Sequence, residues 1–408
     1  MGKALGNTRT PLITAIFASA ASLALATQLA FTAPAPAGLL LTKDFSWQQP
    51  NRSILQPAFS HSGRELAFVQ QFHIPDGDES EQREGVAESR LAKVASNQRL
   101  ADPVVSILHI ATQRIDSVDY GWDPSFSPGD SLLAYAYQHT PISGKRVLAE
   151  TLKGNSIRVY ERRARKRVTI ALPKQGYLLQ PAFANPNTLW YQQGNAINGS
   201  YGGGTGISQY NLRSKRDSVV EAPQKHYGYF NIIGSFHPVP RGLAYVVWQA
   251  ADKGFESNWM ANEYDASLKS RSGLLHQFKK MPFKNVDSRV AITSTGDVVY
   301  LDDQHSLRKE KNYFYQYHGA VIVSRKLFPE EYHEAYLSPN GRYALVCTYE
   351  NTAYLLDIAT LKKTPMELPV DTEVFNAVWS DTSERLVVVQ STSGASQDTD
   401  VLSVFTIH

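Results

Sequence analysis

The 408-residue sequence contains only one cysteine, Cys347, so it cannot form an intramolecular disulfide. Cys347 directly follows the apolar segment Tyr343–Val346, and we therefore expect its thiol to be buried and to pack as a small apolar group. Helical periodicity is scarce, whereas tyrosine, threonine, valine and serine are plentiful. This composition favours an all-β fold.

The sequence also lacks a strong excess of either charge. It has 41 Lys and Arg against 38 Asp and Glu, a formal net charge of +3 that falls to +1 without residues 1–37. A nearly neutral chain has no long-range field that would attract nucleic acid, and we expect no nucleic-acid partner.

Apolar runs long enough to cross a bilayer are missing after residue 37, but the N-terminus contains one. Lys3 and Arg9 flank the start of an uncharged, alanine-rich segment over Pro11–Ala30, and small residues follow over Ala33–Ala37. This arrangement is typical of a secretory signal peptide, and we predict cleavage after Ala37. An uncleaved membrane anchor is the alternative. We therefore expect a periplasmic or secreted protein, made of a signal peptide over residues 1–37 and one domain over residues 38–408.

One pattern recurs along the rest of the chain: a short apolar strand, a turn with serine, proline or glycine, and a second apolar strand. Its clearest copy is Tyr336–Val346, where Ser338 is expected to bond to the turn backbone and Gly341 to adopt a positive φ. The seven copies lie at Pro57–Phe68, Asp123–Tyr135, Gln180–Tyr191, Gly234–Tyr245, Val290–Tyr300, Tyr336–Val346 and Ala377–Val388.

A second hairpin follows most copies, so each repeat supplies about four short strands, as in a β-propeller blade. The seventh copy lacks a fourth strand, whereas Leu39–Phe45 is a strand-like segment without a partner of its own. We predict that this N-terminal segment completes the last blade and removes an exposed sheet edge. The predicted fold is therefore a single seven-bladed, all-β propeller.

The repeat Pro-x-Phe-Ser-x-x-Gly-x-x-Leu-Ala-Phe/Tyr resembles that of TolB-type, WD40-like (PD40) β-propellers, over essentially all of residues 38–408. The resemblance implies the propeller fold and specifies no function. The best-known member of that family carries a separate α/β domain before its propeller, whereas only residues 38–56 precede the first copy here. Prolyl oligopeptidases carry similar propellers, but their Gly-x-Ser-x-Gly motif is missing.

Insertions into the repeats are candidate binding loops. The longest, His73–Pro103, begins with an acidic segment that includes Asp76 and Asp78 and continues as a predicted amphipathic helix over Val86–Leu100. The acidic segment has enough oxygen ligands for calcium but does not match the EF-hand spacing, which favours a solvated loop without a metal. Tyr227 and Tyr229 belong to an aromatic cluster that suits either peptide or sugar binding or packing between blades.

The basic, aromatic and glycine-rich runs each have a functional and a structural interpretation. The basic run Arg162–Arg167 suits an anionic partner or a hydrated hairpin tip, and we favour the tip. The aromatic run Tyr313–His318 suits binding or inter-blade packing, and alternate burial favours packing. Gly202–Gly206 lacks the lysine and helix of a phosphate-binding loop. No histidine spacing or Ser/His/Asp set indicates a metal or a catalytic triad.

These observations predict an exported, monomeric, non-catalytic propeller that acts as a scaffold for an envelope or secreted protein. We expect no catalytic residue, no metal and no cofactor, with Asp76, Asp78, Tyr227 and Tyr229 as binding residues. The alternatives are a propeller hydrolase or lyase with its active site at the central channel, or a carbohydrate-binding module.

Overall fold

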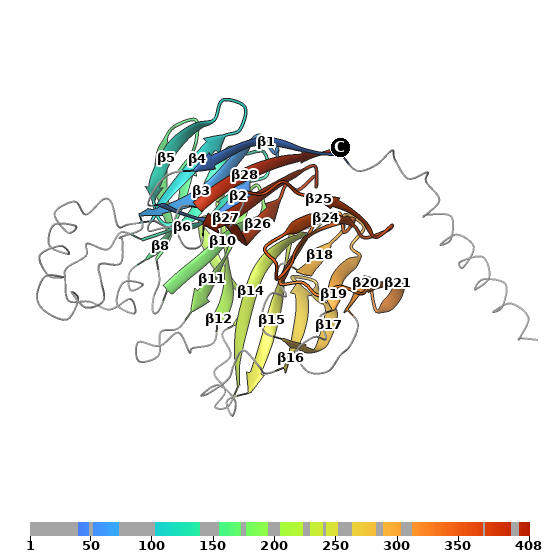
Figure 1. The fold of residues 1–408 in the computed structure, drawn as a ribbon. Coiled ribbons are helices and arrows are strands. Elements are labelled where there is room, and N and C mark those ends of the chain that lie inside the picture. Colours follow the sequence, from blue (N-terminus) through green and yellow to red (C-terminus); the bar gives the residue numbers. More distant parts are fainter. Residues whose placement is uncertain are drawn as a thin grey trace, which may run out of the picture. The chain divides into compact units, whose positions relative to one another are not determined.

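The computed structural model describes residues 40–48, 52–72, 103–138, 155–172, 177–194, 205–222, 229–239, 242–251, 263–282, 289–302, 312–369, 372–392 and 400–408. These residues form seven antiparallel sheets of four strands each, in a ring (Figure 1). No helix occurs among them. The predicted all-β, seven-bladed propeller is therefore confirmed. The helix predicted over Val86–Leu100 lies outside the described residues.

Each of the first three blades runs from an inner to an outer strand in chain order. The first blade contains β2 (Arg52–Phe59), β3 (Glu65–Phe72), β4 (Val104–His109) and β5 (Arg114–Tyr120). The second contains β6 (Trp122–Phe126), β7 (Leu132–Tyr137), β8 (Ser156–Glu161) and β9 (Lys166–Ala171). The third contains β10 (Tyr177–Asn185), β11 (Thr188–Gly194), β12 (Thr205–Asn211) and β13 (Arg216–Glu221).

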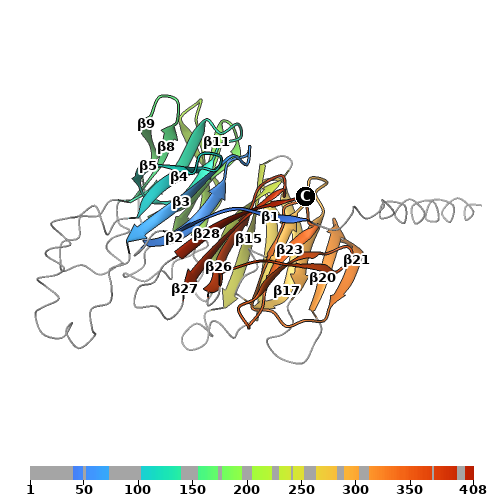
Figure 2. The ribbon, with the colours of Figure 1, turned by 45° about the horizontal axis from the view of Figure 1, so that its top comes forward.

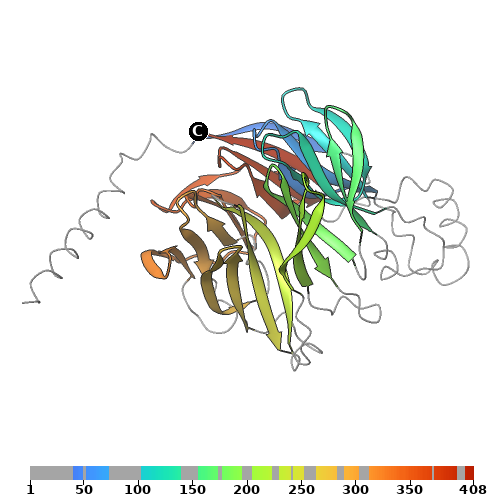
Figure 3. The same ribbon diagram turned by 180° about the vertical axis from the view of Figure 1, so that it is seen from behind.

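The next three blades follow the same order. The fourth contains β14 (Tyr229–Val239), β15 (Gly242–Ala251), β16 (Glu263–Ser270) and β17 (Gly273–Pro282). The fifth contains β18 (Val290–Ile292), β19 (Val298–Asp302), β20 (Asn312–His318) and β21 (Val321–Phe328). The sixth contains β22 (Glu334–Leu337), β23 (Tyr343–Cys347), β24 (Ala353–Asp357) and β25 (Lys362–Pro365). The fourth blade, in yellow, lies between the third and the fifth (Figure 3).

The seventh blade joins the two ends of the described chain. It contains β26 (Thr372–Trp379), β27 (Arg385–Thr392), β28 (Asp400–Ile407) and, as its outer strand, β1 (Leu41–Gln48). β1 pairs antiparallel with β28 from Leu41 opposite Ile407 to Gln48 opposite Val401 (Figure 2). The prediction that an N-terminal strand completes the last blade is therefore confirmed.

The turn between the first two strands of a blade has the predicted geometry. The Ser338 hydroxyl accepts a hydrogen bond from the Tyr343 backbone N–H at 2.9 Å, and Gly341 has a φ of 68°. A serine or threonine hydroxyl accepts the equivalent bond in four other blades, namely at Ser60, Ser127, Thr293 and Ser380. Each such bond satisfies a backbone donor where the second strand starts.

The core consists of apolar layers between neighbouring blades. Between the seventh and first blades, for example, Ile54 and Phe68 pack with Val389 and Leu402, all fully buried. Cys347 is also buried, as predicted, within β23. Burial of these faces against one another stabilises the ring, since a single four-stranded sheet leaves both faces exposed.

Three inter-blade junctions share a polar arrangement, which we call the tyrosine clasp. A carboxylate that ends one blade accepts a hydrogen bond from a tyrosine hydroxyl of the next blade and pairs with a cation of that next blade. The members are Asp119, Tyr135 and Arg158; Glu221, Tyr245 and Lys269; and Glu330, Tyr354 and Lys363. Burial and the carboxylate raise the pKa of each tyrosine, so its hydroxyl stays a donor.

No helix among the described residues has the length and apolar character needed to cross a membrane.

Candidate functional site

Six blades carry a polar residue at the same position, within the inner strand or, in the fifth blade, directly before it, four residues before the turn serine, threonine or alanine. We call these the inner polar positions, and they are occupied by Gln56, Asp123, Gln180, Arg289, Glu334 and Asn376. Arg289 is buried, and the other five are half-buried. Inner strands surround the central channel of a propeller, so this level of the ring carries polar side chains.

The local sequence explains how three of these residues are presented. Gln56, Asp123 and Gln180 have φ values of 49°, 52° and 47°, and each is followed by proline. The ladder with the neighbouring strand is interrupted at each of these sites, as in a β-bulge. Proline cannot donate to the ladder, which favours the bulge at this position.

The three bulge residues contact one another from blade to blade. Gln56 Oε1 accepts a hydrogen bond from the Asp123 backbone N–H at 2.7 Å, and Asp123 Oδ2 accepts one from the Gln180 backbone N–H at 3.0 Å. Gln180 Oε1 in turn accepts a bond from Gln192 Nε2 at 2.5 Å. Positive φ is uncommon for such residues and is often found at functional sites.

Asp123 has the electrostatics of an acid–base group. Burial raises the pKa of its carboxyl to about 6, although hydrogen bonds from the Gln180 backbone and the Gln56 side chain act in the opposite direction. A carboxyl with a pKa near 6 exists in both protonation states near neutral pH. A carboxyl with this pKa suits proton transfer near neutral pH better than a carboxyl with an ordinary pKa does.

A second group of inner polar positions lies on the fifth and sixth blades. The Arg289 guanidinium lies over the Tyr332 ring, 5.2 Å from its centroid. Burial and the charge of Glu334 raise the pKa of Tyr336, whereas the charge of Arg289 lowers it. Burial and Glu334 also raise the pKa of Cys347 to about 12, so this thiol is not a nucleophile.

Of the four binding residues predicted from the sequence, only Tyr229 lies in the described part of the chain. Asp76, Asp78 and Tyr227 lie outside the described residues, as does nearly all of the His73–Pro103 insertion. Tyr229 is the first residue of β14 and pairs with Ala251. The prediction of a binding site at these residues therefore stays a prediction.

Two other sequence clusters are described. The basic run forms the predicted hairpin tip between β8 and β9, where Arg163 and Arg165 are exposed and Arg162 pairs with Glu65 at 2.5 Å. In the aromatic run, Tyr317 packs on His276 of the fourth blade with ring centroids 4.3 Å apart, and Phe314 is buried in the core shared with the sixth blade. The interpretations as a hairpin tip and as packing are confirmed.

The inner polar positions are the residues that sequence reasoning missed. The signal was a polar residue directly before proline: Gln56 precedes the first copy of the repeat, and Asp123 and Gln180 begin the second and third copies. Only the alignment of the repeats on their turn serine shows that the position is polar in six blades.

No protein-family model and no curated protein sequence matches the chain. Solved structures do match. An oligogalacturonate lyase in complex with manganese has a TM-score of 0.54 and 10% identity, over 92% of this chain and 98% of that chain. The β-propeller domain of the Trilobed protease from Pyrococcus furiosus has a TM-score of 0.50 and 14% identity, over 87% and 94%.

An acylaminoacyl peptidase has a TM-score of 0.51 and 14% identity, over 86% of this chain and 51% of that chain. The present chain thus spans about half the length of that peptidase. The structural similarity shows the β-propeller fold, and at identities of 10–14% it shows the fold alone. The Trilobed protease propeller is described as having an open velcro topology, whereas β1 pairs with β28 here. Membership of the TolB-type family stays a prediction.

The comparisons overturn the main functional prediction. The sequence predicts a non-catalytic scaffold for protein binding, but the three solved structures described above are of enzymes or their propeller domains, two of them a protease and a peptidase and one a lyase. The alternative of a propeller enzyme is therefore better supported. The scaffold prediction rested on the missing nucleophile motif, metal-ligand spacing and catalytic triad, whereas acid–base chemistry requires none of these patterns.

Proposed function

We propose that the chain is a propeller enzyme of the hydrolase or lyase class, with its active site at the inner polar positions and Asp123 as the proton-transfer group. The observation that carries this proposal is the Asp123 carboxyl, held between Gln56 and Gln180 with a pKa of about 6. Hydrolysis and elimination both require proton removal at one atom and proton delivery at another.

The neighbours of Asp123 keep its carboxyl in place for this chemistry. The Gln180 N–H and the Gln56 side chain hydrogen-bond to the carboxyl, which limits its rotation. In its charged form Asp123 accepts a proton from the substrate or from water, and in its neutral form it donates one to the leaving oxygen or nitrogen. Arg289 and Glu334 supply the other charges at the inner polar positions for holding a polar substrate.

The solved structures suggest which substrates to test first. The chain aligns with 98% of the oligogalacturonate lyase, with 94% of the Trilobed protease propeller domain and with 51% of the acylaminoacyl peptidase. We propose an oligosaccharide as the first substrate class, because the lyase has the highest TM-score of the three, and peptides as the second. In the described part of the chain, no group of three or more His, Cys, Asp and Glu side chains could hold a metal ion. The proposal therefore assigns no step to manganese.

We also propose that the enzyme is exported. The support is the sequence pattern of residues 1–37, with two cationic residues before an uncharged, alanine-rich segment.

The proposal is tested by incubating the purified protein with oligogalacturonides and, separately, with end-blocked peptides. New double bonds, reducing ends and free amines distinguish elimination, glycoside hydrolysis and peptide hydrolysis. We expect turnover of the oligosaccharide, a loss of about 100-fold or more in Asp123→Asn, and normal turnover in Asp116→Asn. Asp116 lies on the outer strand β5 and is a matched control. No turnover by the folded protein, or full activity of Asp123→Asn, would contradict the proposal.

A further inference from the structure

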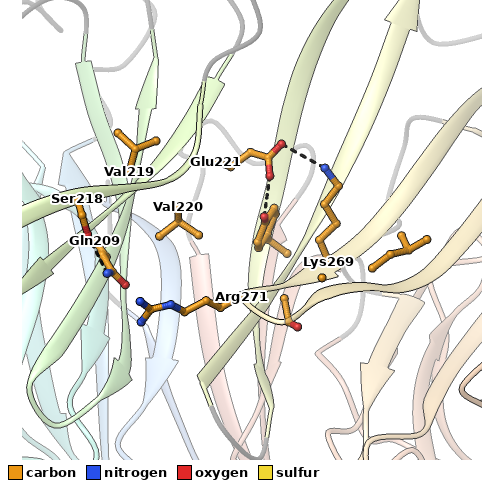
Figure 4. Close-up of a pocket in the computed structure, with 11 residues that line it drawn as sticks. Gln209, Ser218, Val219, Val220, Glu221, Lys269 and Arg271 are labelled. Carbon is orange, nitrogen blue, oxygen red and sulfur yellow. Dashed lines mark hydrogen bonds and ion pairs between the residues drawn. The ribbon is translucent and has the colours of Figure 1, made fainter.

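A pocket far from the inner strands lies between the outer parts of the third and fourth blades. It has a volume of about 550 Å³, within the range of small-molecule sites. Figure 4 shows the residues that line it. We call it the outer pocket and define it by Ser218, Val219, Val220, Lys269, Arg271 and Leu274.

One wall of the outer pocket is a tyrosine clasp. Glu221 accepts hydrogen bonds from the Tyr245 hydroxyl at 2.9 Å and from Lys269 Nζ at 3.2 Å. All three residues line the pocket. The clasp fixes this wall and balances the charges of Glu221 and Lys269 against each other.

Arg271 supplies the uncompensated charge. It lies in the two-residue turn between β16 and β17, which hydrogen bonds between Ser270 and Ser272 stabilise. Its side chain extends towards Gln209 and Ser218 on the opposite wall (Figure 4). Within the described residues, Arg271 has no ion pair and no hydrogen bond with another side chain. The pocket therefore has one net positive charge.

At the tyrosine clasp between the first and second blades, a second arginine, Arg167, has protein partners that Arg271 lacks among the described residues. There Arg167 donates from Nε to the Val118 carbonyl oxygen at 2.8 Å and lies 3.6 Å from the clasp carboxylate of Asp119. Arg271 makes no such contact with Val220 or Glu221 in the described structure. The guanidinium of Arg271 thus remains available for an anion from solution.

The rest of the lining is aliphatic. Val219 is 66% exposed and Leu274 is 61% exposed, an unusual solvent exposure for two large apolar side chains at the rim of one pocket. The aromatic residue in the lining, Tyr245, is only 2% exposed, so it offers no ring face on which a sugar could stack. The walls therefore suit an aliphatic ligand body better than a sugar ring.

We propose that the outer pocket binds a small organic carboxylate, with its carboxylate on Arg271 and its aliphatic body on Val219, Val220 and Leu274. A guanidinium forms bidentate hydrogen bonds with a carboxylate, and burial of the aliphatic body adds hydrophobic stabilisation. Two classes of compound have this chemistry, namely acylated amino acids and short fatty acids. The site lies apart from Asp123, and the proposal is independent of the proposed catalytic function.

The test is calorimetric titration of the full chain with N-acetyl-leucine and with hexanoate, each beside its neutral amide. We expect saturable binding of at least one acid, with its amide at least tenfold weaker. Arg271→Gln should weaken binding by about tenfold to a hundredfold, which corresponds to the loss of a charge-assisted hydrogen bond. Preference between the two acids identifies the source of the ligand.

Arg163→Gln is the matched control, because Arg163 is exposed on the β8–β9 hairpin tip and does not line the pocket. Both variants should melt like the natural protein, and Asp123→Asn should bind the acid normally. The proposal is overturned if no acid binds saturably, if an amide binds as tightly as its acid, or if Arg271→Gln binds like the control. Binding of inorganic phosphate as tight as that of both acids would also overturn it.

Discussion

Gln56 and Asp123 occupy the same position in neighbouring blades, and Gln56 Oε1 accepts the Asp123 backbone N–H at 2.7 Å. Asp123 repeats this relationship with Gln180, whose backbone N–H donates to the Asp123 carboxyl. The position therefore links blades through bonds from one bulge to the next. Of these three residues the middle one, Asp123, has a carboxyl instead of an amide, and this carboxyl is only partly ionised near neutral pH.

We predict that Asp123 destabilises the folded chain above pH 6. Its folded-state pKa of about 6 lies above the ordinary value of 3.8, so the folded state binds more protons between these values. Stability is therefore lost as pH rises from 4 to 6, by roughly 3 kcal/mol for this group. Asp123→Asn should match the natural protein below pH 4 and exceed it at pH 8, as measured by urea unfolding. An equal loss at both pH values would contradict this prediction.

At the junction of the first and seventh blades, His61 also makes stability fall as pH rises, but here the charged form of the side chain stabilises the fold. The hydrogen bond and ion pair with Asp381 raise the pKa of His61, with Asp130 adding to the effect and burial opposing it. Stability from this pair is present below the unfolded pKa of about 6.5 and is lost as pH rises through the folded value.

His61→Gln should therefore destabilise the chain more at pH 5.5 than at pH 8.5. The side chains of His61 and Asp381 are 36% and 42% exposed, so solvent screening limits the difference to below about 1 kcal/mol. Thermal melts of His61→Gln and Asp381→Asn at the two pH values measure it. A larger loss at pH 8.5 than at pH 5.5 would show that the pair acts otherwise.

Closure of the ring depends on β1, whose Phe45 and Trp47 pack against the core between the seventh and first blades. The Trp47 ring packs edge-to-face on Phe68 of the first blade, with centroids 5.5 Å apart, while its backbone pairs with Leu402. Trp47→Ala should lower the free energy of unfolding by about 1–3 kcal/mol, less than for a fully buried tryptophan. Leu40→Ala, at a residue that is 60% exposed, is the control and should change stability little. An equal effect of both would rule out this role for Trp47.

The tyrosine clasps predict that removal of a single tyrosine hydroxyl lowers the stability of the fold at each of three junctions. Tyr135→Phe, Tyr245→Phe and Tyr354→Phe each remove one hydroxyl that donates to a carboxylate at 2.6–2.9 Å. Each should lower stability by about 1–3 kcal/mol, the range for a hydrogen bond to a charged group. Urea unfolding curves measure the differences. A variant as stable as the natural protein would show that its clasp does not contribute.

The fold was predictable from the sequence because its determinants are local and repeated. The Ser338 hydroxyl bond spans five residues, and Gly341 closes the same turn. Even the position of β1 followed from the sequence, since the seventh repeat lacked a strand and Leu39–Phe45 lacked a partner.

The candidate site was not predictable in the same way. Asp123 lies 67 residues from Gln56 and 57 from Gln180, and each partner is an amide that carries no catalytic signal by itself. The raised pKa of Asp123 arises from burial, which depends on how three blades pack. The pairing of Glu221 with Tyr245 and Lys269 likewise requires the order of the blades. Sequence reasoning therefore concentrated on Asp76, Asp78, Tyr227 and Tyr229, whose local composition is conspicuous.

The pKa of Asp123 in solution is the measurement on which the proposed active site most directly depends. Carbon-detected NMR of protein labelled at the aspartate carboxyls, with Asp123→Asn to assign the signal, follows this group through a pH titration. We predict a midpoint of about 6 for Asp123. A midpoint at or below the ordinary value of 3.8 would show a permanently charged structural carboxylate and would contradict its role in proton transfer.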